Sequence, residues 1–245
     1  MIYFKDKKIN SVDELYDEYS KDEFKSPFRS TIPLIILFKK NHLQKLEVFS
    51  FSEKDKIKYT FEYKVPVRKG EGNSSYTDLM IITENSSIAI EAKSTEPKYE
   101  TIEKWLGNSD NKKLVLDWWL QLIELKTGVK VEQQKIKDLP YQLIHRTASA
   151  CYSKKKHTSV IYLGFDITNN MINYYTYCLN KISKILSNKI DFYFITYNLQ
   201  KYEEQQRLEN LWKSGERDLS SDIINCLKSN NLMDFKLLQI IKINN

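Results

Sequence analysis

Three side chains that could hold and use a divalent cation lie near one another in the sequence: Asp78, Glu91 and Lys93. Asp78 opens one apolar run, residues 77–83, and the other two end a second run, residues 88–93. Charged groups beside a core are costly unless they pair with one another or hold a metal. Carboxylates without a histidine or cysteine among them suit Mg²⁺, which completes its octahedron with water and phosphate oxygens. The pattern therefore predicts a magnesium site at which the lysine orients or deprotonates a water, or balances charge on a phosphate.

The two apolar runs are separated by four polar residues and together predict a β-hairpin. With the turn centred between Asn85 and Ser86, Asp78 lies opposite Lys93 and about 7–8 Å from Glu91 along the diagonal. Opposed residues share a face of the sheet, as do residues two apart on one strand, so the three charged side chains share one face. The other face then carries apolar side chains: Leu79, Ile81, Ile88, Ile90 and Ala92.

The order of these residues resembles a known nuclease pattern: Asp78, twelve intervening residues, and then the triplet Glu91-Ala92-Lys93. Restriction-endonuclease-like members of the PD-(D/E)XK nuclease superfamily carry an acid, a variable gap and an E-x-K triplet that closes the next strand. Thr77 stands where that family usually has a proline, which weakens the motif without changing its chemistry. The resemblance implies an α/β, restriction-endonuclease-like fold with a central mixed β-sheet flanked by helices.

The resemblance also implies how the residues act. Asp78, Glu91 and the backbone carbonyl of Ala92 would bind Mg²⁺, for which Mn²⁺ would substitute. Lys93 would activate or orient water and stabilise developing charge.

Two further residues match weaker parts of the family pattern. Many members have an additional acid upstream, and Glu62 is the candidate for this extra metal ligand; its alternative is an ion pair with Lys64 or another neighbour on a solvent face. In the predicted helix at residues 140–151, Gln142 matches a glutamine that helps position the site. No tyrosine follows four residues later; Arg146 stands there and could hold a phosphate by two parallel hydrogen bonds.

A compact basic run follows that helix. On a nuclease its side chains would contact nucleic-acid phosphates, whereas the alternative is a solvated connection. The residues concerned are Lys154, Lys155 and Lys156.

The alternative to a nuclease site is an exposed hairpin with surface charges at its end. Charged residues make up 29% of the chain, so an Asp followed at loose spacing by Glu-x-Lys arises by chance in many proteins. Glu124-Leu125-Lys126, on a predicted helix, is such a coincidence. A strand that begins at the acid, a short turn and an apolar strand that delivers the triplet favour the nuclease interpretation.

The remaining periodicity predicts helices that alternate with strands, and hence a mixed sheet covered by helices. A capping box of Ser11 and Glu14 is expected to open the first helix. The predicted helices cover residues 11–19, 31–40, 96–124, 171–188 and 200–230, and the further strands cover 46–67, as a hairpin with a turn at 53–56, 158–165 and 191–199. We expect one nuclease domain over residues 1–245, with a catalytic core at about 46–166, a helical N-terminal lead-in and an α/β C-terminal extension.

Composition bounds the function only loosely. With 41% hydrophobic residues the chain is typical of a globular protein, and its three well-separated cysteines suit reduced thiols. The first ten residues are too charged for a signal peptide, and the longest apolar run, residues 32–38, cannot span a bilayer. We therefore expect a cytoplasmic protein without a membrane partner. An excess of 38 basic over 32 acidic residues favours a polyanionic partner weakly.

Together these features predict a Mg²⁺-dependent DNA endonuclease that hydrolyses phosphodiester bonds in double-stranded DNA, as a restriction or phage-defence enzyme. The resemblance makes a homodimer one expectation. Two alternatives stay open: a repair or recombination nuclease of the same fold, and a catalytically inactive DNA-binding protein on that scaffold. The sequence leaves the recognition site and the choice between DNA and RNA open.

Overall fold

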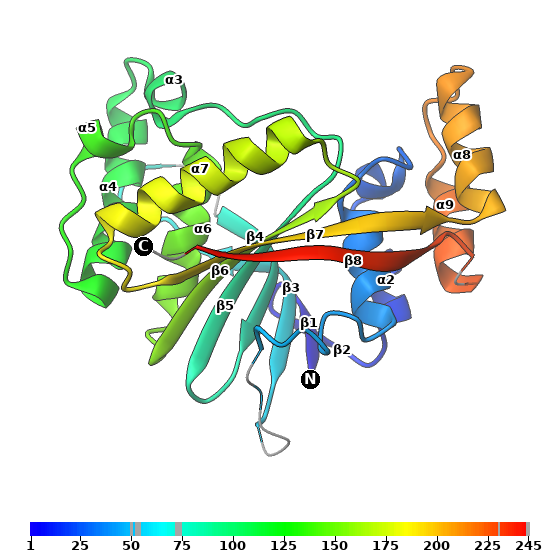
Figure 1. Cartoon of the computed structure of the whole chain (residues 1–245), viewed down its shortest axis with the longest axis horizontal. Helices are drawn as coiled ribbons and strands as arrows, with labels where there is room; N and C mark the ends of the chain where they lie inside the picture. Colours follow the sequence, from blue (N-terminus) through cyan, green and yellow to red (C-terminus); the bar gives the residue numbers. More distant parts are fainter. Residues whose placement is uncertain (50, 52–54, 72–74, 230, 244–245) are drawn as a thin grey trace.

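A mixed eight-stranded β-sheet forms the centre of the molecule (Figure 1). The computed structural model describes residues 1–49, 51, 55–71, 75–229 and 231–243. Along the sheet the strand order is β2-β1-β3-β4-β5-β6-β7-β8. The strands are β1 (Ile2–Phe4), β2 (Lys7–Ile9), β3 (Lys58–Val65), β4 (Ser75–Ile82), β5 (Ser86–Lys93), β6 (His157–Phe165), β7 (Asp191–Lys201) and β8 (Met233–Ile243).

Parallel pairing in the middle of the sheet brings the carboxyl ends of three strands together. β5, β6 and β7 run parallel to one another, and β3 and β4 join β5 through antiparallel pairs. β8 is antiparallel to β7, whereas β1 is parallel to β3 and antiparallel to β2. The end of β5 therefore lies beside the start of β4 and the ends of β6 and β7, where polar side chains from several elements can meet.

Helices cover both faces of the sheet (Figure 1). On one side, α2 (Thr31–Lys39), α8 (Glu203–Lys213) and α9 (Ser220–Ser229) share an apolar core with the sheet, the first core. On the other, α4 (Asp110–Thr127), α6 (Tyr141–Tyr152) and α7 (Asn169–Ile185) form the second core. The shorter helices are η1 (Val12–Glu14), α1 (Leu15–Glu18), η2 (Lys21–Phe24), α3 (Ile102–Leu106) and α5 (Gln133–Ile136). The predicted α/β class, with a mixed sheet flanked by helices, is confirmed.

The β4–β5 hairpin is confirmed, but its predicted register was wrong by two residues. Met80 pairs with Ala89, and the turn is closed by a 2.9 Å hydrogen bond from the Thr83 amide to the Ser86 carbonyl. The Thr83 hydroxyl also accepts hydrogen bonds from the amides of Asn85 and Ser86, so the turn is centred one residue earlier than predicted. Because a shift of two residues preserves the faces, the five predicted apolar side chains all lie in the first core.

Two local predictions were wrong. Among the described residues of the range 46–67, there is one strand, β3, in place of the predicted hairpin. Leu46 and Phe49 lie in or beside a turn and are buried in the first core, and Phe49 stacks on Phe51 at 5.2 Å. Residues 53 and 54 of the predicted turn lie outside the described residues. The capping box at Ser11 is absent because Glu14 accepts hydrogen bonds from Asn10 instead, and the helix is divided into η1 and α1.

The chain also begins differently from the predicted helical lead-in, since the short hairpin β1–β2 precedes its first helix. The main helices α2, α4, α6 and α7 lie within or close to their predicted ranges. Gly128 ends α4 with a φ of 72°, a left-handed conformation that favours glycine. Among the described residues, no helix has both the length and the apolar composition needed to cross a membrane.

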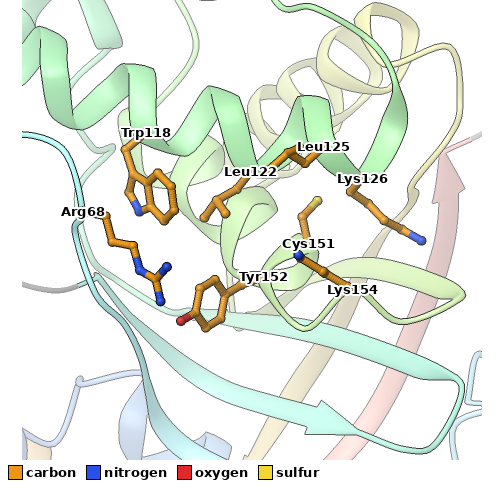
Figure 2. Close-up of a pocket in the computed structure, with 8 residues that line it drawn as sticks. All are labelled: Arg68, Trp118, Leu122, Leu125, Lys126, Cys151, Tyr152 and Lys154. Carbon is orange, nitrogen blue, oxygen red and sulfur yellow. The ribbon is translucent and has the colours of Figure 1, made fainter.

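On the side of the second core, a pocket of about 730 Å³ lies against α4 and the carboxyl end of α6 (Figure 2). A second, smaller pocket lies where β4, β5 and α6 meet, and it contains the predicted catalytic residues.

Candidate active site

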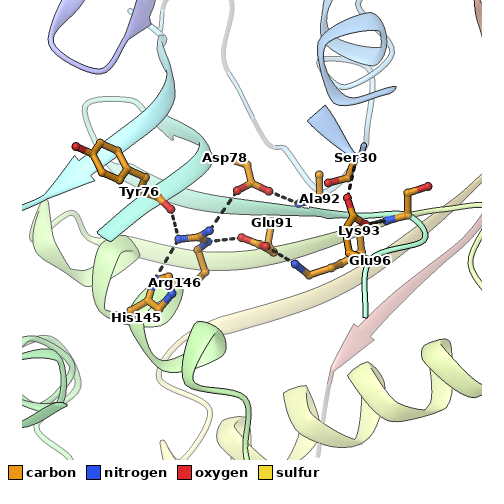
Figure 3. Close-up of polar contacts among 10 residues, drawn as sticks. Ser30, Tyr76, Asp78, Glu91, Ala92, Lys93, Glu96, His145 and Arg146 are labelled. Atoms are coloured by element: carbon orange, nitrogen blue, oxygen red, sulfur yellow. Dashed lines mark hydrogen bonds and ion pairs between the residues drawn. The ribbon is translucent and has the colours of Figure 1, made fainter. Parts of the chain in front are cut away.

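The three side chains predicted to form the site converge in the smaller pocket, joined by Arg146 from α6 (Figure 3). Lys93 Nζ donates to Glu91 Oε1 at 2.5 Å, and the Ala92 amide donates to Asp78 Oδ2 at 2.8 Å. The Arg146 guanidinium lies between the two acids: Nη2 is 3.2 Å from Asp78 Oδ1, and Nε donates to Glu91 Oε2. The prediction that Asp78, Glu91 and Lys93 share one face agrees with this arrangement.

Strand geometry explains why Asp78 and Glu91 meet. The ladder between β4 and β5 pairs Leu79 with Ile90 and ends there. One step further along the same register, Asp78 faces Glu91 directly, and its carboxylate takes the Ala92 amide as a partner. The two acids are thus cross-strand neighbours, closer than the predicted diagonal.

Glu62 lies at a break in β3, beside Asp78. The β3–β4 ladder contains Phe61↔Leu79 and Tyr63↔Thr77, and between these pairs Glu62 has a φ of 49°. Before the break Phe61 packs into the first core, whereas after it Tyr63 packs against the second. The strand therefore turns over at Glu62, and a non-glycine residue in this left-handed region costs about 1–2 kcal/mol.

The turned strand leaves Glu62 in the wall of the pocket with Asp78 and Glu91. Within the described residues, no ion pair joins Glu62 to Lys64, so the alternative partner considered for Glu62 is not used.

The pocket is small and rich in carboxylates. Its volume is about 160 Å³, which corresponds to about five water molecules at ~30 Å³ each. That space suits a phosphate group and an ion, and a nucleoside would have to lie outside it. Its charged lining consists of five acids and three bases: Glu23, Glu62, Asp78, Glu91, Glu96, Arg29, Lys93 and Arg146.

Burial and this excess of acids shift the pKa values in the site. Burial, together with the charge of Glu91, raises the pKa of Asp78 to about 8, and burial raises the pKa of Glu62 to about 7. Burial also acts on Glu91, but Arg146 and Lys93 outweigh it and hold the pKa of Glu91 below its ordinary value. Burial opposes the charge on Lys93, yet the Glu91 carboxylate raises the pKa of Lys93 above its ordinary value. Burial therefore disfavours the charged forms of Asp78 and Glu62, although Arg146 lies close to Asp78, whereas Lys93 keeps its positive charge beside Glu91.

Arg146 is buried inside the site, although it was predicted to contact nucleic acid. Its Nη1 donates to the Tyr76 carbonyl and lies 3.1 Å from His145 Nδ1, while its other nitrogens face Asp78 and Glu91. Only 5% of the residue is exposed. Its guanidinium is therefore the internal cation that links β4, β5 and α6, and a role in holding phosphate stays a prediction.

The other predicted residues, Gln142 and the basic run, lie apart from one another. Gln142 is buried, lines the smaller pocket, and has no hydrogen-bond partner for its side chain among the described residues. Lys154 lines the larger pocket, beyond the carboxyl end of α6. Lys155 Nζ donates to the Glu84 carbonyl at 3.1 Å, and Lys126 Nζ donates to the Lys155 and Lys156 carbonyls. The basic run is therefore not part of the smaller pocket.

Two residues after β5 that contact the site or connect it to α2, Glu96 and Tyr99, were not predicted from the sequence. Glu96 accepts hydrogen bonds from the amides of Ser30 at 2.8 Å and Ser94 at 2.6 Å, joining the start of α2 to the end of β5. The Lys93 ammonium lies 4.3 Å from the centre of the Tyr99 ring. The only sequence signal for Glu96 was its position three residues after the triplet.

The donor atoms of the pocket suit a magnesium ion, although they are not arranged around one. Asp78, Glu91, Glu62 and the Ala92 carbonyl offer the hard oxygens that Mg²⁺ prefers. Among the described residues, however, no group of three or more acidic, histidine or cysteine side chains is positioned to hold a metal ion. Arg146 engages one oxygen of each acid, and the Ala92 amide and Lys93 engage the other two, so an ion that binds both acids would share or displace these partners.

Comparison with known proteins places the chain in a family. Residues 8–201 match the family described as "Domain of unknown function (DUF6946)". The chain belongs to this family. Searches of the curated proteins and of the solved structures found no match. The family description gives no activity, so the function is inferred from the site.

Proposed function

We propose that this member of the DUF6946 family is a Mg²⁺-dependent endonuclease that hydrolyses phosphodiester bonds in DNA. The observation that carries the proposal is the meeting of Asp78, Glu91 and Lys93 in one small pocket whose carboxylates outnumber its bases. A pocket that accepts an ion and a phosphate, with the rest of the ligand outside, suits hydrolysis of a long phosphodiester chain.

The proposal includes a restriction-endonuclease-like fold and a defence role such as restriction. The acid within β4, the triplet at the end of β5 and a glutamine on α6 support the fold. The role rests on analogy, because one fold hosts several activities.

Each residue has a distinct role in the proposed reaction. When bound, a divalent cation supplies Lewis-acid activation of water and of the phosphoryl group. Asp78, Glu91 and the Ala92 carbonyl would hold it, with Glu62 as a further ligand. Lys93 stays protonated beside Glu91, which favours charge stabilisation over deprotonation of water.

Two residues of α6 would serve the substrate. Gln142, buried and without an internal partner, would orient the attacking water or a phosphate oxygen. Arg146, on releasing an acid, would present its guanidinium to the scissile phosphate.

One observation favours a second candidate, a DNA-binding protein that does not cleave. The Arg146 guanidinium already links Asp78 and Glu91, as a fixed positive charge in place of an ion would. If Arg146 keeps both contacts, its charge takes the place of the ion, and the protein would bind DNA without cleaving it.

Plasmid cleavage in Mg²⁺ tests the proposal. We expect Glu91→Gln and Lys93→Ala each to lower the cleavage rate at least about 100-fold. The first removes the charge of a proposed metal ligand, and the second removes a cation that stabilises developing charge at the phosphate. Glu124→Gln is the matched control, since it makes the same change in the coincidental Glu-x-Lys triplet on α4 and should cut like the wild type. Equal cutting by all four proteins would refute the site, and DNA binding without cleavage would support the second candidate.

A further inference from the structure

The larger pocket, against α4 and the end of α6, has the size of a ligand site (Figure 2). Its volume of about 730 Å³ falls in the range of pockets that hold small molecules, ~300–1,000 Å³. It shares no lining residue with the smaller pocket. Its lining is Arg68, Trp118, Leu122, Leu125, Lys126, Cys151, Tyr152 and Lys154.

The charged side chains that line this pocket are all basic. Arg68, Lys126 and Lys154 contribute three basic groups, and none of the described residues that line the pocket carries a carboxylate. Lys126 is engaged with backbone carbonyls, but in the part of the chain that the structure describes neither Arg68 nor Lys154 has an ion-pair partner. The Arg68 guanidinium lies 5.8 Å from the Trp118 ring, which holds it at the pocket. The two unpaired cations would attract an anion.

The rest of the lining is apolar or aromatic. Trp118, Leu122 and Cys151 are buried beneath the opening, whereas 66% of Leu125 is exposed. Tyr152 stands beside Arg68 and Lys154 in Figure 2, with part of its ring accessible. Burial raises the pKa of the Cys151 thiol to about 12, so this group adds no negative charge. A flat apolar ligand could therefore lie beside the cations without meeting an acid.

We propose that this pocket binds a nucleotide, with the base against Tyr152 and the two leucines and the phosphate between Arg68 and Lys154. Aromatic rings accept bases of any sequence by stacking, and arginine and lysine bind phosphate. The nucleotide is either free or an unpaired unit of a nucleic-acid strand. The inference does not depend on a metal or on cleavage at the smaller pocket.

Isothermal titration in EDTA separates this proposal from the proposed nuclease activity. The probes are dAMP, deoxyadenosine, inorganic phosphate and a single-stranded 12-mer of DNA. We expect dAMP to bind at least tenfold more tightly than deoxyadenosine or phosphate, because only dAMP engages both parts of the pocket. Binding of dAMP by the wild type would identify a free nucleotide as a ligand, and binding of the 12-mer alone would identify a nucleotide within a strand.

Variants connect the binding to this pocket. We expect Arg68→Glu and Lys154→Glu each to weaken binding at least tenfold, and Tyr152→Ala by about 5- to 100-fold, the range typical of base stacking. Tyr152→Phe should retain binding, because it keeps the ring. Lys236→Glu is the charge-matched control, since Lys236 is exposed on β8. The proposal is overturned if neither dAMP nor the 12-mer binds, or if the pocket variants bind like the control.

Discussion

At the scale of single residues, ionisation of the partly buried Asp78 carboxyl is expected to lower the free energy of unfolding. Its pKa rises from 3.8 to about 8 on folding. Between these values the folded protein holds a proton that the unfolded chain has lost, so the free energy of unfolding falls as pH rises from about 4 to 8.

We therefore expect Asp78→Asn to flatten this dependence. In EDTA, the variant and the wild type should have similar melting temperatures at about pH 4, the acid end of this range, and the variant should be the more stable at about pH 8. Asp110→Asn, at an exposed residue of α4, is the control. Parallel melting curves against pH for the wild type and Asp78→Asn would show that Asp78 ionises freely in the folded protein.

The left-handed backbone conformation of Glu62 can also be tested by substitution. Its φ of 49° is one that glycine adopts without strain and alanine does not. We expect Glu62→Gly to be more stable than Glu62→Ala by about 1 kcal/mol in urea unfolding, since both lose the same carboxylate. At Lys64, an exposed residue of the regular part of β3, we expect the opposite order: Lys64→Ala should be more stable than Lys64→Gly by about 0.5–1 kcal/mol. The same order at both positions would contradict the strained conformation.

At the scale of elements, Glu96 is the link between α2 and β5. Removing its side chain would leave the Ser30 and Ser94 amides without these partners. We expect Glu96→Ala to lower the free energy of unfolding by about 1–3 kcal/mol and to speed hydrogen exchange at the Ser94 amide. Glu100→Ala, at an exposed residue of the same connection, is the control and should leave both measurements unchanged.

Elements were predicted well where periodicity was strong, and poorly where a single side chain decided the geometry. The faces of β4 and β5 followed from apolar alternation, but their register depended on the Thr83 hydroxyl. Short strands such as β1 have too few residues for a period to show. Arg146 and Glu91 are 55 positions apart in the sequence. Only the folded chain therefore shows that the Arg146 guanidinium is paired with an acid inside the site.

At the scale of the whole molecule, an ion that binds only the folded chain must stabilise it. At a Mg²⁺ concentration 100-fold above the dissociation constant, the gain is about 2.7 kcal/mol, or about 5–10 °C in melting temperature for a chain of this size. We expect this rise for the wild type and Glu124→Gln and its loss in Glu91→Gln. No rise in the wild type would contradict the proposed metal site.

The turn of β3 at Glu62 also has a mechanical consequence for the two helix layers. One half of this strand is anchored among the side chains around α2, and the other half among those around α4 and α6. A displacement of either group of helices would therefore act on β3 from one side of Glu62, an acid that lines the site.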